Sequence, residues 1–263
     1  MANPVPTTPP IFGPPTFGLI VPPREGAVPP EANRIYPDMN FVARGLGLIE
    51  MAHQDYDRVI ADTTDHAILL AASGVDAISL MGTSLSFFKG PAFNDKLIET
   101  LQSATGLPAT TMSQAIIDGL ALFSARKVAI LSAYEDDVNA RLCNYLAAYG
   151  IRVVNSAGLN IRNIADLPHI SGEYLMTRCR ELLMKSGDCD TLLVSCGGLR
   201  TIDLAPAIEK ETGIPVVSSA VAGLWATVNL IPSHTRDQKQ RTMFGKLFDQ
   251  PFPIRPAPTD HDN

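Results

Sequence analysis

Short apolar runs rich in β-branched residues alternate with amphipathic segments along most of the chain. Strands that are apolar on both faces are typical of a parallel sheet, because the crossover helices cover both of its sides. The alternation therefore predicts an α/β protein. We expect strands at 17–22, 75–82, 107–112, 127–133, 151–156, 190–196 and 214–219. Helical spacing of apolar residues predicts helices at 56–72, 93–105, 113–124, 135–149, 172–185, 202–211 and 220–231.

The chain also contains an internal repeat. The segment DAISLMGTSL, which starts at Asp76, aligns without gaps with DTLLVSCGGL, which starts at Asp190. TGLP at 105–108 recurs as TGIP at 212–215, and GLIV at 18–21 resembles VAIL at 128–131. All three pairs are separated by 107 to 114 residues. A repeat of this length with matched strand ends predicts two similar βα halves.

These two patterns define the expected architecture. We predict two pseudo-symmetric Rossmann-like halves, each a four-stranded, mostly parallel sheet flanked by helices, with the active site in the cleft between them. The first half should comprise residues 16–115 together with 233–250, and the second residues 116–232. Ten of the 21 prolines lie in residues 1–30 and four in 251–263, which predicts extended tails at 1–15 and 251–263.

Composition excludes several classes of protein. With 46% hydrophobic residues the chain can form a core, and a net charge of −6 without a basic stripe argues against a nucleic-acid partner. No apolar run approaches the ~20 residues of a membrane helix. The amino terminus, MANPVPTTPPIFGPP, lacks the basic and apolar regions of a signal peptide. We expect a cytoplasmic protein that binds neither nucleic acid nor membrane.

The chain has four cysteines but no CxxC or HExxH spacing, so we expect neither a disulfide framework nor a metal site. Cys196 differs from the others because it ends a predicted strand and precedes two glycines. A thiol at such a strand end can act as a nucleophile or as a proton donor. Cys143, Cys179 and Cys189 are interpreted as small hydrophobic residues.

The repeat places a second turn opposite Cys196. Gly82, Thr83 and Ser84 occupy the equivalent position in the first half, where their hydroxyl and N–H groups could hold a carboxylate or simply cap a helix. Ligands of open α/β sheets bind beyond the carboxyl ends of the strands. The cleft should therefore also include Pro22 and Tyr134, which follow two other strands.

Several segments identify a family resemblance. They are GLIVPP (18–23), RIYPDMNFVARGLGL (34–48), SLMGTSLSFFKG (79–90), LSAYEDDVNARL (131–142), LLVSCGGLRTID (192–203), GIPVVSSAVAGLW (213–225) and FGKLFDQ (244–250). Together they closely resemble the arylmalonate decarboxylases, cofactor-free enzymes of the aspartate/glutamate racemase superfamily. The combination of GTS and SCGG at this separation is specific. The resemblance covers essentially residues 18–250.

The resemblance implies a reaction and a site. A disubstituted aryl- or vinylmalonate would lose CO₂, and the resulting enediolate needs fixed hydrogen-bond donors. Cys196 would protonate one face of it, giving one enantiomer of a 2-arylpropionate-type acid. The implied donors are the hydroxyls of Thr83, Ser84 and Tyr134 and the N–H groups of Cys196 and Gly197. The departing carboxylate would lie in an apolar pocket beside Pro22, Leu48, Ile164 and Leu167, and Gly82, Pro23 and Tyr56 complete the implied substrate site.

One position departs from the superfamily pattern of two facing cysteines, because Gly82 replaces the first of them. A two-base racemase needs an acid/base group on each face of the substrate carbon, and a single thiol serves only one. This argues against ordinary racemases and two-cysteine maleate isomerases, and agrees with the decarboxylase pattern. No metal, biotin, pyridoxal or thiamine is expected.

Two other functions stay open from the sequence. Cys196 alone could racemise or isomerise a small carboxylic acid, or the cleft could bind a carboxylate without turnover. In each case we expect a small dicarboxylate as ligand, and a monomer rather than a homodimer.

Overall fold

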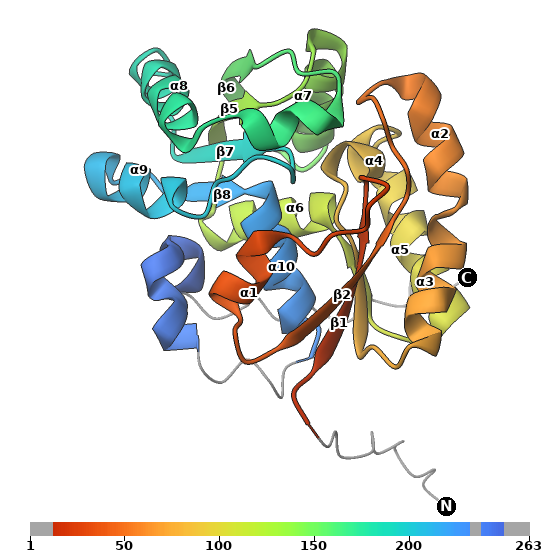
Figure 1. Cartoon of the computed structure of the whole chain (residues 1–263). Coiled ribbons are helices and arrows are strands. Elements are labelled where there is room, and N and C mark those ends of the chain that lie inside the picture. Colours follow the sequence, from red (N-terminus) through yellow and green to blue (C-terminus); the bar gives the residue numbers. More distant parts are fainter. Residues whose placement is uncertain (1–12, 232–237, 250–263) are drawn as a thin grey trace, which may run out of the picture.

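The computed structural model describes residues 13–231 and 238–249 and contains two four-stranded parallel sheets (Figure 1). The first sheet has the order β2-β1-β3-β4 and the second the order β6-β5-β7-β8. The strands are β1 (Thr16–Val21), β2 (Asn40–Gly45), β3 (Ala77–Leu80), β4 (Ala109–Thr111), β5 (Lys127–Ser132), β6 (Arg152–Gly158), β7 (Thr191–Ser195) and β8 (Val216–Ser218). The same strand order in both sheets confirms the predicted pseudo-symmetric α/β fold.

Helices flank both sheets, and α6 packs against α10 between them (Figure 1). The α-helices are α1 (Pro30–Ile35), α2 (His53–Ala61), α3 (Thr63–Ala72), α4 (Thr83–Phe87), α5 (Pro91–Thr105), α6 (Met112–Leu122), α7 (Asp136–Ala147), α8 (Gly172–Met184), α9 (Leu204–Thr212) and α10 (Ser219–Asn229). Short 3₁₀ segments are η1 (Ile164–His169), η3 (Gln238–Phe244) and η4 (Lys246–Phe248).

The strand and helix predictions were incomplete in the first half. The sequence pattern missed β2, because this edge strand has alternately exposed and half-buried residues and therefore lacks the continuous apolar run of a buried strand. It also missed α1 and α4, which are too short to show a helical period. The helix predicted over residues 56–72 was wrong as a single element: α2 ends at Ala61 and α3 begins at Thr63.

The aspartates that open the repeated segments have the same structural role. The carboxylate of Asp76 accepts a hydrogen bond from the N–H of Thr16 at 2.8 Å, at the start of β1. The carboxylate of Asp190 accepts from the N–H groups of Arg126 and Lys127 at 2.9 Å each, at the start of β5. Each aspartate therefore fixes the first strand of its half to the segment that enters the third. This shared contact accounts for the aspartate at the start of both repeated segments.

A short antiparallel contact joins the two halves. The N–H of Met51 donates to the carbonyl of Arg162 at 2.8 Å, and the N–H of Ile164 donates to the carbonyl of Ile49 at 3.1 Å. Glu50 forms the β-bridge between these bonds, and its carboxylate accepts from the Arg162 guanidinium at 2.7 Å. This contact sets the positions of the segments that follow β2 and β6.

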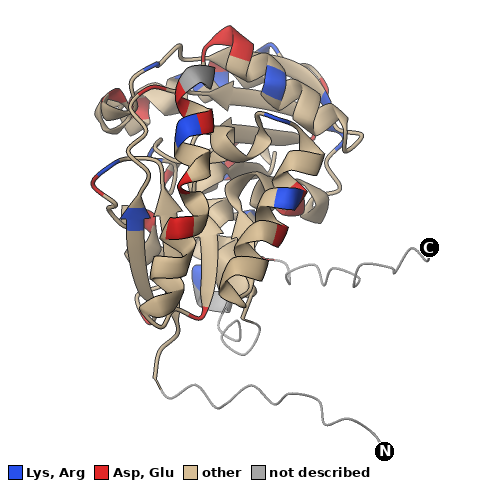
Figure 2. Ribbon diagram, turned by 90° about the vertical axis from the view of Figure 1, so that its right-hand side faces the viewer, with Lys and Arg blue, Asp and Glu red and all other residues tan. Residues whose placement is uncertain are grey.

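Charged residues lie mainly on the outer helices and loops (Figure 2). Four charged residues are buried within the described part of the chain: Glu31, Asp118, Glu209 and Arg241. No helix in the two described ranges is long and apolar enough to cross a membrane. The predicted division at residues 115/116 stays a prediction, and the expected tails lie almost entirely outside the described residues. The segment 238–249 contacts both halves, through Arg241 to the Ile35 carbonyl and through Lys246 to Glu209.

Candidate active site

A pocket of about 250 Å³ opens where four parallel strands end. Pro22 follows β1, Gly82 follows β3, Tyr134 follows β5 and Cys196 follows β7, and all four residues line it. Because the carboxyl ends of the two sheets face each other here, the pocket lies in the cleft that the repeat predicted. Its walls therefore come from both halves of the chain.

The structure brings together nearly all of the predicted site residues. Those lining the pocket are Pro22, Pro23, Leu48, Gly82, Thr83, Ser84, Tyr134, Ile164, Leu167, Cys196 and Gly197. Tyr56 is the exception, because its ring is fully buried behind the pocket and its hydroxyl interacts with Ser84. We therefore place Tyr56 as a support for Ser84 rather than as a lining residue.

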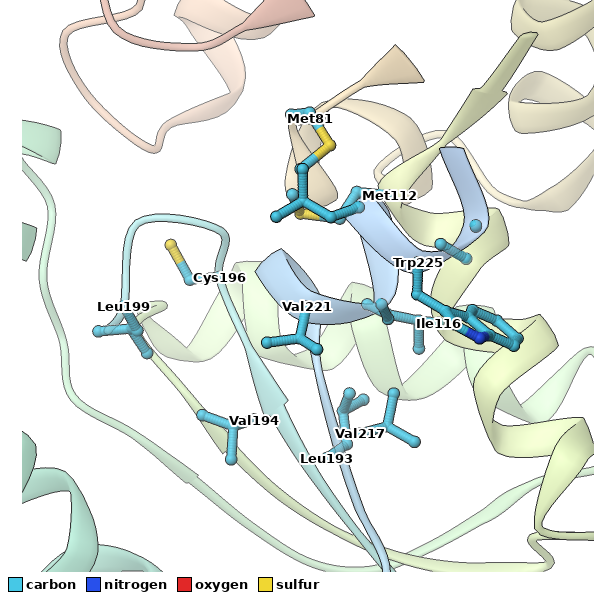
Figure 3. Packing of buried hydrophobic residues seen from close by; sticks show 14 of the residues in the cluster. Met81, Met112, Ile116, Leu193, Val194, Cys196, Leu199, Val217, Val221 and Trp225 are labelled. Carbon is cyan, nitrogen blue, oxygen red and sulfur yellow. The ribbon is translucent and has the colours of Figure 1, made fainter. Parts of the chain in front are cut away.

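Cys196 has an unusual backbone conformation. Its φ of +134° is one that residues with a side chain rarely adopt, whereas Gly82, its counterpart, has an ordinary φ of −126°. The Cys196 N–H donates to the Ser219 hydroxyl at 3.1 Å, which holds this conformation. Figure 3 shows Cys196 in the loop beyond the strand that carries Val194. Backbone strain maintained by a specific hydrogen bond is typical of functional positions.

The environment of Cys196 keeps its thiol protonated. The side chain is buried, and this burial raises the thiol pKa to about 11, although an interaction with the Gly198 backbone opposes the shift. At neutral pH the group is therefore an S–H donor rather than a thiolate.

Three residues that line the pocket carry hydroxyl groups: Thr83, Ser84 and Tyr134. Thr83 Oγ1 donates to the sulfur of Met112 at 2.8 Å, and a thioether is a weak acceptor that a carboxylate can replace. Burial raises the pKa of Tyr134, so its hydroxyl remains a donor, and the Ser195 hydroxyl lies 3.5 Å from it. Ser86 supports Thr83 by donating to its carbonyl at 3.0 Å. These contacts hold the donors before a ligand arrives, as oxyanion stabilisation requires.

One predicted donor is already occupied. The sequence resemblance implied that the N–H groups of Cys196 and Gly197 both face the substrate, but the Cys196 N–H is bonded to Ser219. The Gly197 N–H makes no hydrogen bond to another described residue. It is therefore the backbone donor that this loop can offer to a carboxylate.

Sequence reasoning missed several residues of the pocket. They are Val21, Ala27, Val28, Pro29, Pro30, Glu31, Met51, Met81, Met112, Pro168 and Arg200. Met112 directly follows β4 and Arg200 is four residues after Cys196, so both could have been found by extending the strand-end rule. Met51 and Glu31 carry no such signal, because the folding of the loops after β2 and β1 brings them to the pocket.

The remaining cysteines and histidines form no cluster. Within residues 13–231 and 238–249, no group of three or more His, Cys, Asp or Glu side chains could hold a metal ion. Cys179 and Cys189 are buried and Cys143 is half-buried, and none of them lines the pocket.

Comparison with known proteins agrees with this geometry. The sequence model of the family described as arylmalonate decarboxylase matches residues 17–246. The chain belongs to the arylmalonate decarboxylase family. It is 43% identical to the arylmalonate decarboxylase of Bordetella bronchiseptica over 236 residues, which is 90% of this chain and 97% of that protein. The expectation of a carboxy-lyase is thereby confirmed.

Solved structures agree with the assignment. A crystal structure of arylmalonate decarboxylase has 43% sequence identity and a TM-score of 0.80, covering 89% of this chain and 99% of that one. A maleate isomerase from Pseudomonas putida S16 has a TM-score of 0.82 at 20% identity, covering 89% of this chain and 98% of that one. At that identity the isomerase shows a shared fold.

Proposed function

We propose that this carboxy-lyase removes CO₂ from disubstituted aryl- or vinylmalonates without a cofactor, and that Cys196 protonates one face of the resulting enediolate. The observation that carries the proposal is the state of that thiol. It is buried, held at a positive φ and protonated at neutral pH, and the equivalent position in the other half is Gly82. One proton donor on one face predicts one enantiomer of the product.

The proposed binding mode follows from the polarity of the pocket walls. The carboxylate that is retained accepts hydrogen bonds from Thr83, Ser84 and Tyr134 and from the Gly197 N–H. The carboxylate that leaves lies against Leu48 and the other apolar side chains at Pro22, Ile164 and Leu167. Loss of hydration there favours neutral CO₂ over the anion.

The proton balance is simple. Cleavage of the C–C bond releases CO₂ and leaves its electron pair on the α-carbon, delocalised into the retained carboxylate and the aryl or vinyl group. The Cys196 S–H transfers its proton to that carbon, and the thiolate recovers a proton from solvent before the next turnover. Buried Tyr134 keeps its own proton because its pKa is raised, and therefore acts as a donor to the enediolate oxygen.

Isomerisation is the second candidate, because maleate isomerases share the fold. It is disfavoured by Gly82, which leaves the opposite face of the substrate carbon without a thiol. The ligand in both cases is a small dicarboxylate, and we propose that the chain acts as a cytoplasmic monomer.

The deciding experiment measures CO₂ release and product chirality with phenylmalonate and methylphenylmalonate in metal-free buffer. We expect stoichiometric CO₂ and a single enantiomer from the methylated substrate. Exchange of the α-proton of an optically pure acid without decarboxylation of malonates would favour the isomerase. Binding of malonates without any turnover would instead indicate a carboxylate-binding protein.

A further inference from the structure

A second cavity adjoins the reaction pocket. Its volume is about 580 Å³, more than twice that of the reaction pocket, and Pro30, Glu31 and Arg200 line both. We call this second cavity the vestibule; Arg34, Met176 and Arg180 also contribute to its wall. Because the two cavities share these three residues, they lie side by side.

Arg200 is the arginine of the vestibule that forms no ion pair with another described residue. Arg34 donates two hydrogen bonds to Asp203, at 2.9 and 2.7 Å, and Arg180 is bound in the same bidentate way to Glu211. Arg200 is exposed and makes no hydrogen bond or ion pair with another residue of the described ranges. Two arginines are thus neutralised by their partners, and the third has its guanidinium available.

Three acidic residues also line the vestibule, and none of them forms an ion pair with Arg200. Asp203 is paired with Arg34. Glu31 is buried; burial raises its pKa, and the nearby charge of Arg200 lowers it. Glu173 is exposed and lies in the first turn of α8, where the helix dipole attracts negative charge.

We propose that the vestibule is a subsite for an acidic group at the far end of the substrate's large substituent, and that Arg200 binds this group. The inference rests on the proposed function, because the large substituent points toward Arg200 only if the retained carboxylate lies at Thr83 and Tyr134. A guanidinium binds a carboxylate through two parallel hydrogen bonds, which gives geometric selectivity as well as attraction. The favoured substrates are therefore arylmalonates whose ring carries a second, distal carboxylate.

The test compares 4-carboxyphenylmalonate with its neutral isostere, 4-carbamoylphenylmalonate. In the wild-type protein we expect KM for the acid to be about fivefold lower, the upper end for an ion pair that remains exposed, with similar kcat. Arg200→Gln should bring the KM ratio close to one, and Arg200→Lys should restore part of it. Arg44→Gln is the charge-matched control, because Arg44 is exposed on β2 and lines neither cavity.

A binding measurement separates this inference from the proposed function. Calorimetry with 4-carboxyphenylacetate and 4-carbamoylphenylacetate needs no turnover, and should show the same preference and the same loss in Arg200→Gln. Equal dissociation constants for the two acids, or a preference that survives Arg200→Gln, would overturn the subsite. Failure to decarboxylate either malonate, with the binding preference intact, would overturn the proposed function and leave the acidic subsite standing.

Discussion

The thiol sulfur of Cys196 lies 3.9 Å from the thioether sulfur of Met51. The two residues come from opposite halves of the chain, and the hydrogen bond from the Met51 N–H to the Arg162 carbonyl joins the Met51 segment to the half that carries Cys196. Met51 therefore forms the wall next to the proposed proton donor. Its size should limit the substituent that the α-carbon can carry on this side.

A smaller side chain at position 51 should broaden the range of substituents that the substrate can carry. We expect Met51→Val to raise kcat/KM for ethyl- and propyl-substituted phenylmalonates relative to the methyl compound, because space opens beside the thiol. The measurement is a series of kcat/KM values across alkyl lengths for both proteins. An unchanged series in a folded variant would show that another residue limits the substituent.

Replacing the thiol should remove the proton-transfer step. For Cys196→Ala we expect decarboxylation to slow by about 10²–10⁴-fold, the usual contribution of a positioned acid, and residual product to lose its enantiomeric purity. Cys143→Ala is the matched control, since Cys143 is half-buried on α7 and lines no part of the pocket. Wild-type rate and selectivity in Cys196→Ala would exclude this thiol as the donor.

The raised pKa of Cys196 predicts how the protein is alkylated. Burial disfavours the thiolate, so the group ionises only as the pH rises toward about 11. At pH 8 about one molecule in a thousand is ionised, and iodoacetamide should label Cys196 very slowly. The check is a pH series of labelling rates in a Cys143→Ala background, read by peptide mass spectrometry. A labelling midpoint below pH 8.5 would contradict a buried, protonated thiol.

A thiol at position 82 tests the pseudo-symmetry. Gly82→Cys should exchange the α-proton of a single-enantiomer arylpropionate and racemise it, because acid/base groups would then face both sides of one carbon. Gly82 has an ordinary φ, so the expected cost is crowding: an added Cβ would lie 2.8 Å from the end of the flexible Leu85 side chain.

Gly82→Ala is the control for this experiment, since it introduces the same crowding without the thiol. Deuterium incorporation and optical rotation are measured for both variants. If the cysteine variant binds the acid yet exchanges no faster than the alanine variant, positions 82 and 196 do not flank the substrate carbon.

Ser219 should act as a positioning residue. In Ser219→Ala the Cys196 N–H loses its acceptor, and the strained loop can rotate the thiol away from the substrate. We expect kcat to fall by about 10- to 100-fold with reduced enantiomeric purity, and Ser219→Thr to recover most of both. Ser218→Ala is the control, because the Ser218 hydroxyl accepts a hydrogen bond from Thr201 instead. A change in thermal stability alone, with normal kcat and purity, would mean that the contact is merely structural.

Much of the fold was readable from the sequence because its determinants are local. Buried parallel strands need continuous apolar runs, and the aspartates at 76 and 190 repeat because each fixes a strand start. Cys196 was identified for the same reason: the carboxyl end of a buried strand is visible as the last residue of an apolar run. The edge strand β2 was missed because one-sided exposure leaves a mixed composition.

The tertiary structure alone decided what surrounds the thiol. Met51 reaches Cys196 only because residues 49–51 pair with residues 162–164, more than 100 positions away in the sequence. The hydrogen bond from the Cys196 N–H to Ser219 also depends on the tertiary structure. The same holds for Arg200, which forms no ion pair with another described residue. Periodicity records which face of an element is buried, whereas pairings between distant loops depend on how the assembled sheets place them.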